Sequence, residues 1–239
     1  MATSERPGGR DEGVRSRAGD SQARRDSRLR TGLARRARTS AALVAAARTM
    51  FGEQGWAETR MEDVARAAGV SVATAYNHFP SKHALIGAAF AAAWQEGLEE
   101  GGPEPGTEPD VPGLPGDRTR ELAAHLWRIS HIARRHQPLT AAFACAVQEY
   151  VARVQQRPSV EASDDPRPST RVPERIAVLL DAAQRSGELG RQREPADLAE
   201  QLTFLLFLRC FTHPEEDAAA TAEMLLAIAV GVLPAGPSG

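Results

Sequence analysis

The chain has 239 residues, a hydrophobic content of 42% and a formal net charge of −2. This length allows one large or two small domains, and few aromatic residues beside abundant Ala, Leu and Arg favour helices over sheets. The longest apolar run is too short to span a bilayer, and the two cysteines, Cys145 and Cys210, lack metal-site spacing. The composition therefore predicts a globular helical protein in a reducing, cytoplasmic setting, without a disulfide framework.

The charge is distributed unevenly along the chain. Residues 1–40 contain eleven Arg and five Asp or Glu, a balance of +6, so the remaining residues sum to −8. No apolar period appears up to about residue 37, which predicts a disordered basic arm over residues 1–37. Such an arm favours a polyanionic partner at this end of the chain, and a solvated tail with no partner explains the composition equally well.

A first helix is predicted over residues 40–54, where Gly52 and Gly55 end the apolar pattern. A second helix of about two turns follows, with Gly69 at the position of a left-handed C-cap. Thr59 and Glu62 have the spacing of a capping box at its start. Residues of the two buried faces are Leu43, Val44, Ala47, Met50 and Phe51, then Met61, Val64, Ala65 and Ala68.

The stretch GVSVATAYNHFPSK has the pattern expected for the turn and second helix of a helix-turn-helix. Gly69 stops one helix, and Ser71 is suited to cap a third short helix over residues 72–77. Phe79 is expected to turn into the core, and Ser81 to cap a fourth helix after Pro80. In this motif the second helix of the pair lies in the DNA major groove.

Residues 60–82 carry side chains suited to DNA. Small groups let a backbone approach base edges, and polar groups at the helix end suit phosphate oxygens. Lys82 falls in a first helical turn, where an ammonium and a helix N-terminus can act on one anion. The candidates are Arg60, Ser71, Val72, Ala73, Thr74, Tyr76, Asn77, His78 and Lys82.

TRMEDVARAAGVSVATAYNHFPSKHALIGAAF resembles the DNA-binding domain of TetR-family transcriptional regulators. The resemblance implies phosphate contacts at Tyr76, His78 and Lys82, with a backbone contact at Arg60. It implies groove readout by residues 71–74, with Asn77 beside them. The plainer alternatives are a core aromatic at Tyr76, an unpartnered surface His78 and a helix C-cap at Asn77.

The resemblance also implies an all-α architecture. Residues 38–84 would form a three-helix helix-turn-helix DNA-binding domain, and residues 85–239 a helical ligand-binding and dimerisation domain. Further helices are predicted around residues 85–94, 122–133, 139–154 and 176–183, with Pro-rich loops over 101–116 and 157–169. Residues 202–211, LTFLLFLRCF, are apolar on nearly every side and are expected to be buried all round.

The last two helices carry more apolar surface than one subunit needs, which favours a homodimer on a palindromic operator. The alternative is that the last helix is the core of a monomer. The resemblance implies a small apolar effector contacting residues in the body, and Glu149 is a further polar candidate. The expected contacts are His125, Trp127, Phe143, Gln148, Tyr150 and Phe204.

No catalytic, nucleotide-binding or cofactor motif appears in the sequence. His125, His131 and His136 do not share a helix face, so no metal site is expected. The sequence therefore predicts a DNA-binding repressor that a small molecule releases from its operator, without a cofactor. An activator or a ligand-independent regulator of the same fold is the main alternative, and a helical enzyme is the distant one.

Overall fold

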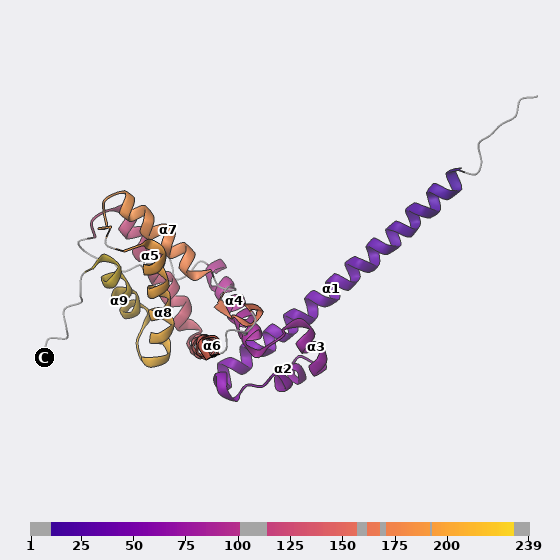
Figure 1. The fold of residues 1–239 in the computed structure, drawn as a ribbon, viewed down its shortest axis with the longest axis horizontal. Helices are drawn as coiled ribbons and strands as arrows, with labels where there is room; N and C mark the ends of the chain where they lie inside the picture. The colour runs from indigo at the N-terminus through magenta and orange to yellow at the C-terminus, as the bar shows by residue number, and fades with distance from the viewer. Residues whose placement is uncertain (1–10, 101–113, 157–161, 168–170, 192, 232–239) are drawn as a thin grey trace, which may run out of the picture. The chain divides into compact units, whose positions relative to one another are not determined.

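The computed structural model describes residues 11–100, 114–156, 162–167, 171–191 and 193–231. All regular elements in these residues are helices, so the predicted all-α class is confirmed (Figure 1). None of the helices in the described ranges combines the length and apolar character needed to cross a membrane. The chain divides into two compact units, Met1–Ala42 and Leu43–Gly239.

Helix α1, Asp11–Glu58, begins inside the segment that the sequence predicts to be a disordered arm. Residues 11–37 are helical in the structure, while residues 1–10 lie outside the described residues. The disorder prediction rests on the absence of an apolar period, but no proline lies between residues 11 and 37, and the Ala and Arg residues there favour helix. Side chains 27–38 are all exposed, so in this unit the helix depends on backbone hydrogen bonds and propensity.

Within the second unit, the end of α1 packs with three shorter elements to form a head. These are α2, Met61–Ala67, α3, Val72–His78, and the start of α4, Lys82–Glu99. Gly55 has φ 78° and breaks the helical path of α1, as the sequence predicts for the end of the first helix. The fully or nearly fully buried core of the head comprises Leu43, Ala47, Phe51, Met61, Val64, Ala65, Ala75 and Leu85.

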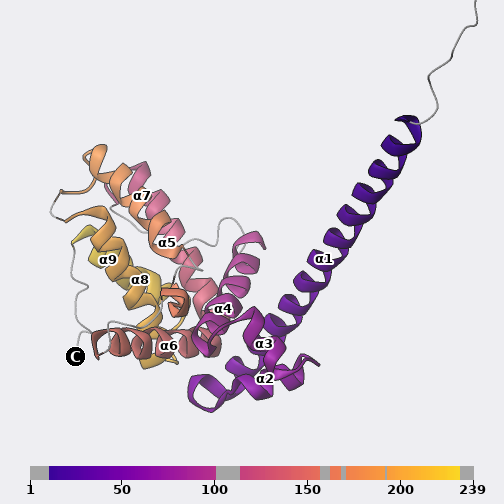
Figure 2. The same cartoon turned by 45° about the vertical axis from the view of Figure 1, so that its right-hand side comes forward.

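Helix α4 begins in the head and continues beside α5 and α6 of the body (Figure 2). Two of its glycines allow close contacts with the body. A Cβ on Gly87 would lie 2.7 Å from the backbone oxygen of Pro166, in the segment after α6. A Cβ on Gly97 would lie 2.8 Å from Cγ2 of Ile132 on α5. Each glycine therefore lets α4 lie closer to the body than any larger residue would allow. Glycine in a helix costs about 1 kcal/mol relative to alanine, and this close packing offsets that cost.

Within the described residues, five α-helices after α4 form the body. They are α5, Asp117–Arg135, α6, Gln137–Gln156, α7, Val172–Arg185, α8, Pro195–Thr212, and α9, Ala218–Val230. Helix α5 packs against α7 and α9, and α8 packs against α6 and α7. The predicted apolar faces of α5 and α7 are buried. Of the predicted loops over 101–116 and 157–169, residues 101–113, 157–161 and 168–169 lie outside the described residues, and Ala162–Asp164 form a short 3-10 helix, η1.

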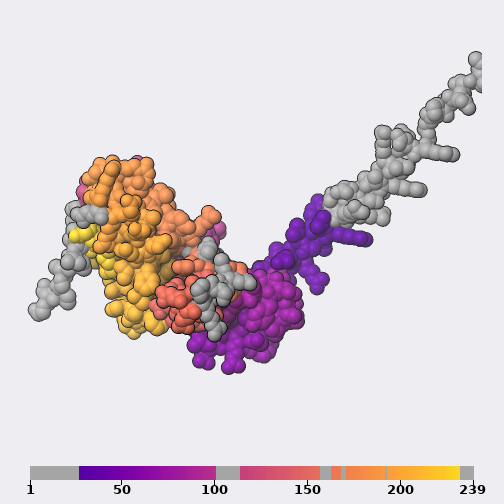
Figure 3. Space-filling model, viewed as in Figure 1, coloured from indigo at the N-terminus to yellow at the C-terminus, as the bar shows by residue number. Residues whose placement is uncertain are grey.

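Helix α8 is not buried all round, so that prediction is wrong. Leu202, Leu206 and Cys210 are fully buried, while Phe204 and Phe211 are each 52% exposed. The two exposed rings are seven residues apart and therefore lie on one face of the helix. The other helices of the body cover only the opposite face, and the space-filling view shows α8 and α9 at the surface (Figure 3).

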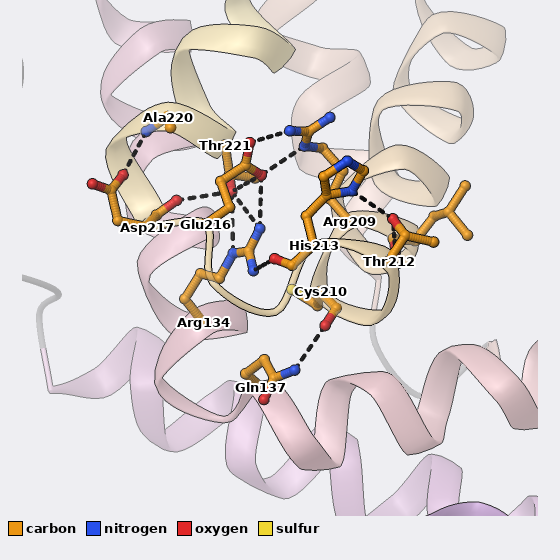
Figure 4. A network of polar contacts seen from close by, with 11 residues as sticks. Arg134, Gln137, Arg209, Cys210, Thr212, His213, Glu216, Asp217, Ala220 and Thr221 are labelled. Atoms are coloured by element: carbon orange, nitrogen blue, oxygen red, sulfur yellow. Dashed lines mark hydrogen bonds and ion pairs between the residues drawn. The ribbon is translucent and has the colours of Figure 1, made fainter.

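A polar network joins α5 to the turn between α8 and α9 (Figure 4). Glu216 accepts hydrogen bonds from Arg134 Nη2 at 2.7 Å, Arg209 Nε at 2.6 Å and Thr221 Oγ1 at 2.9 Å. Arg134 also donates to the carbonyl oxygen of His213 at 2.7 Å. The hydrogen bond from Arg209 is the main cause that lowers the pKa of Glu216. These bonds set the geometry at which α9 leaves α8.

Candidate nucleic-acid interface

The turn between α2 and α3 is closed by a glycine, as predicted. Gly69 has φ +68°, a left-handed conformation that glycine adopts without steric cost. The Gly69 N–H donates to the Arg66 carbonyl at 3.1 Å, and the Val70 N–H donates to the Ala65 carbonyl at 2.9 Å. This pair of bonds is the Schellman pattern, which ends α2 and turns the chain toward α3 within two residues.

Ser71 caps α3 as the sequence predicts. Its Oγ accepts a hydrogen bond from the Thr74 N–H at 3.1 Å, and the Ser71 and Thr74 hydroxyls lie 2.8 Å apart. The cap satisfies one of the free amides of a helix that has only seven residues. It also holds the Thr74 hydroxyl at the helix start, which restricts the atoms that Thr74 can offer to a base.

The outward face of α3 consists of Val72, Ala73, Tyr76 and Asn77, all exposed. Their i, i+1, i+4, i+5 spacing makes one continuous face, and Ala75 on the opposite side is fully buried. The structure therefore brings together four of the predicted DNA-contacting residues. Tyr76 is 44% exposed and so is not a core aromatic.

The remaining candidates lie around this face with differing exposure. Thr74 and His78 are half-buried, while Arg60 is exposed as the N-cap residue of α2. The Arg60 carbonyl accepts from the Asp63 and Val64 N–H groups at 3.2 Å, and its side chain makes no cap bond. None of these residues is sealed in the interior.

The predicted capping box at Thr59 and Glu62 is wrong. Thr59 is 1% exposed, and its hydroxyl donates to the Gly55 carbonyl at 2.8 Å and to the Met50 carbonyl at 3.3 Å. Gly55 breaks α1 and leaves carbonyls that Thr59 satisfies, so its side chain is unavailable to α2. Arg60, which has an extended backbone, is therefore the N-cap residue of α2.

Lys82 follows Ser81, whose Oγ caps α4 by accepting from the Ala84 N–H at 3.1 Å. The Lys82 ammonium donates to the carbonyl of Trp56 and lies 4.1 Å from the centroid of the Trp56 ring. Partial burial lowers the pKa of Lys82, and the nearby carboxylates of Glu149 and Glu58 oppose that shift. Lys82 therefore contacts Trp56 within the head and also carries the positive charge that a phosphate contact needs.

Trp56, His83 and Glu149 form a cluster next to Lys82 that the sequence does not reveal. The Trp56 Nε1–H donates to Glu149 Oε2 at 2.7 Å. His83 is 4% exposed, and its Nε2 lies 3.8 Å from Glu149 Oε1 without a hydrogen bond. Burial lowers the pKa of His83, with Glu149 opposing the shift. Glu149 is 93 residues from Trp56, a separation at which no local pattern signals a contact.

The six predicted effector contacts do not gather around one described cavity. An open groove of about 400 Å³ is lined by residues of α1 and the α5–α6 turn, and a cavity of about 180 Å³ by the ends of α7, α8 and α9. None of the six lines either space. Trp127, Phe143 and Tyr150 are buried, His125 is half-buried, and Gln148 and Phe204 are exposed.

Phe143 belongs to an aromatic cluster of the core. Its ring centroid lies 4.3 Å from that of Phe90 on α4 and 5.5 Å from that of Phe207 on α8.

Burial, together with Arg128 and Arg175, lowers the pKa of His125 to about 4. Among the described residues, no group of three or more His, Cys, Asp or Glu side chains is placed to hold a metal ion.

A short capped helix with an outward face, reached from the preceding helix through a glycine turn, is the arrangement of a helix-turn-helix DNA-binding domain. Residues 43–89 match the family model described as bacterial regulatory proteins, tetR family. The resemblance to the TetR family is thus confirmed for this domain, so residues 43–89 form a DNA-binding domain of the type found in TetR-family transcriptional regulators. No curated protein sequence matches the chain significantly.

Solved structures of several bacterial regulators are similar to this chain in fold. The FadR repressor of Thermus thermophilus, in complex with lauroyl-CoA, has 20% identity and a TM-score of 0.51, over 84% of this chain and 98% of its own. A putative regulator from Rhodococcus sp. has 23% identity and a TM-score of 0.54, over 81% and 98%. FadR of Bacillus halodurans has 12% identity and a TM-score of 0.54, over 80% and 94%.

Proposed function

We propose that this protein is a cytoplasmic transcriptional repressor that binds a palindromic operator as a homodimer and is released by a small-molecule effector. The observation that carries the proposal is the outward face of α3, where Val72, Ala73, Tyr76 and Asn77 are exposed on a helix held by a glycine turn and a serine cap. Base edges would meet Val72, Ala73 and Asn77, and phosphates would meet Arg60, Tyr76, His78 and Lys82.

The exposed apolar face of α8 supports the homodimer. Phe204 and Phe211 lie on one helix face, and Met224 and Ile228 of α9 are only half-buried. A two-fold interface built from α8 and α9 would bury these side chains against the same patch of a second copy. Two copies would then present two α3 helices to half-sites about 34 Å apart, one turn of DNA.

The effector proposal rests on the body being a separate helical region connected to the head through α4. A ligand among Trp127, Phe143 and Tyr150 would have to separate side chains that are now packed in the core. Because α4 contributes Phe90 to that core, such a separation would act on the helix that carries the head. A coupling free energy of about 1–3 kcal/mol is typical for such linkage.

DNA binding is tested by selecting duplexes from a random-sequence pool with the purified protein and measuring affinity by gel shift. His78→Ala and Lys82→Ala should each weaken binding by a similar factor for all duplexes, because phosphate contacts carry no sequence information. Lys82→Ala should also lower the salt slope, because it removes a cation that displaces counterions. Failure to enrich any palindromic sequence would contradict the proposal. Glu174→Ala, on an exposed residue of α7, is the control.

Regulation is tested with the selected duplex placed over a promoter in a transcription assay. Repression supports the proposal, and stimulation favours the alternative that the chain is an activator. Lauroyl-CoA, the ligand of the Thermus thermophilus structure, is the first effector to test. If a panel of acyl-CoA compounds and small apolar molecules leaves operator affinity unchanged, regulation does not depend on that class of ligand.

A further inference from the structure

We infer that Glu149 on α6 is a positioning residue for DNA binding, which sets the place of Lys82 through Trp56. This inference rests on the proposed function, because it takes Lys82 to be a phosphate-contacting residue. Glu149 belongs to the body, whereas Trp56 and Lys82 belong to the head. The three side chains therefore form a polar connection from the body to the DNA-binding surface.

Trp56 is the central member of this connection. Its indole N–H, the single donor of the side chain, is directed to Glu149 Oε2 at 2.7 Å. Its carbonyl oxygen accepts from the Lys82 ammonium, and its ring lies under the same ammonium at 4.1 Å. Both the position and the tilt of the indole thus affect where the Lys82 charge lies.

The surroundings restrict the Glu149 carboxylate to this role. Oε1 faces His83 Nε2 at 3.8 Å and Arg153 Nε at 3.5 Å, while Oε2 faces Trp56. The His83 ring packs against the indole with centroids 4.7 Å apart, which supports the orientation of Trp56 from the buried side. Glu149 is consequently engaged with the head, rather than directed at an effector as the sequence suggests.

The connection is suited to positioning more than to stability. The Glu149 side chain is 44% exposed, and partly exposed polar pairs contribute little to the free energy of folding. The hydrogen bond is nevertheless sensitive to distance, since a shift of about 1 Å would move the two atoms beyond hydrogen-bonding range. A small displacement of α6 would therefore release Trp56 without unfolding the head.

Three substitutions separate the hydrogen bond from packing. Glu149→Ala removes the acceptor, Trp56→Phe removes the donor but keeps a ring, and Glu149→Gln keeps an acceptor without the charge. We expect Glu149→Ala and Trp56→Phe each to lower affinity for the selected duplex by about three- to tenfold, and Glu149→Gln to stay within about twofold of the wild type. Glu174→Ala is the matched control.

The double substitutions test the route through Lys82. Glu149→Ala should have no further effect in a Trp56→Phe or a Lys82→Ala background, because each change breaks the same connection. Glu149→Ala should also lower the salt slope of binding by about one, as the loss of one phosphate contact does. A residue with a merely structural role would lower the thermal midpoint without changing the slope.

The outcomes distinguish this inference from the proposed function. If the wild type enriches no duplex, the DNA-binding proposal fails, and the inference fails with it. If the wild type binds but Glu149→Ala and Trp56→Phe bind with unchanged or higher affinity and the same slope, only the inference is overturned. Additive losses in the double variants would overturn it as well.

Discussion

Removing the Glu216 carboxylate should destabilise the body by about 3 kcal/mol. Arg134 is 8% exposed at its side chain and Glu216 14%, so the pair is largely shielded from water. Breaking a buried pair costs about 3–5 kcal/mol, since the remaining charge keeps its desolvation penalty. The lower end applies here, because Arg134 keeps its bond to the His213 carbonyl and Arg209 is 25% exposed.

The assay is urea unfolding of Glu216→Ala, followed by circular dichroism at pH 7 and at one protein concentration. The comparison is Asp181→Ala, which removes an exposed i, i+4 partner of Arg185 on α7 and should cost at most about 0.5 kcal/mol. Glu216→Gln retains hydrogen-bond acceptors and should fall between the two. A loss below about 1 kcal/mol for Glu216→Ala, or an equal loss for Asp181→Ala, would refute the assignment of the network as a stabilising element.

Three further predictions concern backbone fit and protonation. Gly87→Ala should lower the free energy of unfolding by about 1–2 kcal/mol, because the new Cβ would meet the Pro166 backbone. Gly97→Ala should lower it by less, because there the new Cβ would meet a side chain. Equal urea midpoints for the two variants would contradict this difference. Gly69→Ala should cost about 1–2 kcal/mol through backbone strain alone, since no atom lies within 4 Å of the new Cβ, and an unchanged midpoint would contradict the left-handed turn. The pKa of His125 is lowered to about 4, so the unfolded chain binds the extra proton and stability should fall as the pH drops from about 6.5 to about 4. This dependence amounts to roughly 3 kcal/mol, and urea midpoints measured across that range should show it largely lost in His125→Gln.

Local signals predict the head well. The turn at Gly69 and the caps at Ser71 and Ser81 depend only on backbone angles or on hydrogen bonds to residues fewer than four positions away. Each of the three occupies the turn or cap position that its chemistry favours. The Thr59 capping box fails because the break at Gly55 presents carbonyls that compete for the same hydroxyl. A competing acceptor created by a neighbouring turn is not visible in spacing alone.

Contacts between residues far apart in the sequence account for the remaining differences between the predictions and the structure. Trp56 with Glu149, and Arg134 with Glu216, join residues more than 80 positions apart, so no periodicity indicates them. The exposure of Phe204 also depends on which side of α8 meets the body, whereas composition indicates only that the helix is apolar. The exposure of the candidate residues on α3 is easier to predict, because it follows from the cap and the period of one short helix.

The connection through α4 and α6 gives the proposed regulation a physical route. Gly87 and Gly97 allow α4 to lie close to the body, and the bond from Trp56 to Glu149 joins the end of α1 to α6. A change in the body can therefore reach the head by two kinds of contact, one of packing and one polar. Substitutions at these positions separate the two contributions to operator affinity.

The most direct test of the central claim is a binding profile of the wild type and Val72→Ala on every single-base variant of the selected operator. If the exposed face of α3 enters the major groove, the variant should lose affinity and discrimination at one or two base positions of each half-site and match the wild type elsewhere. A uniform loss over all positions, or identical profiles, would contradict the claim that this face reads DNA.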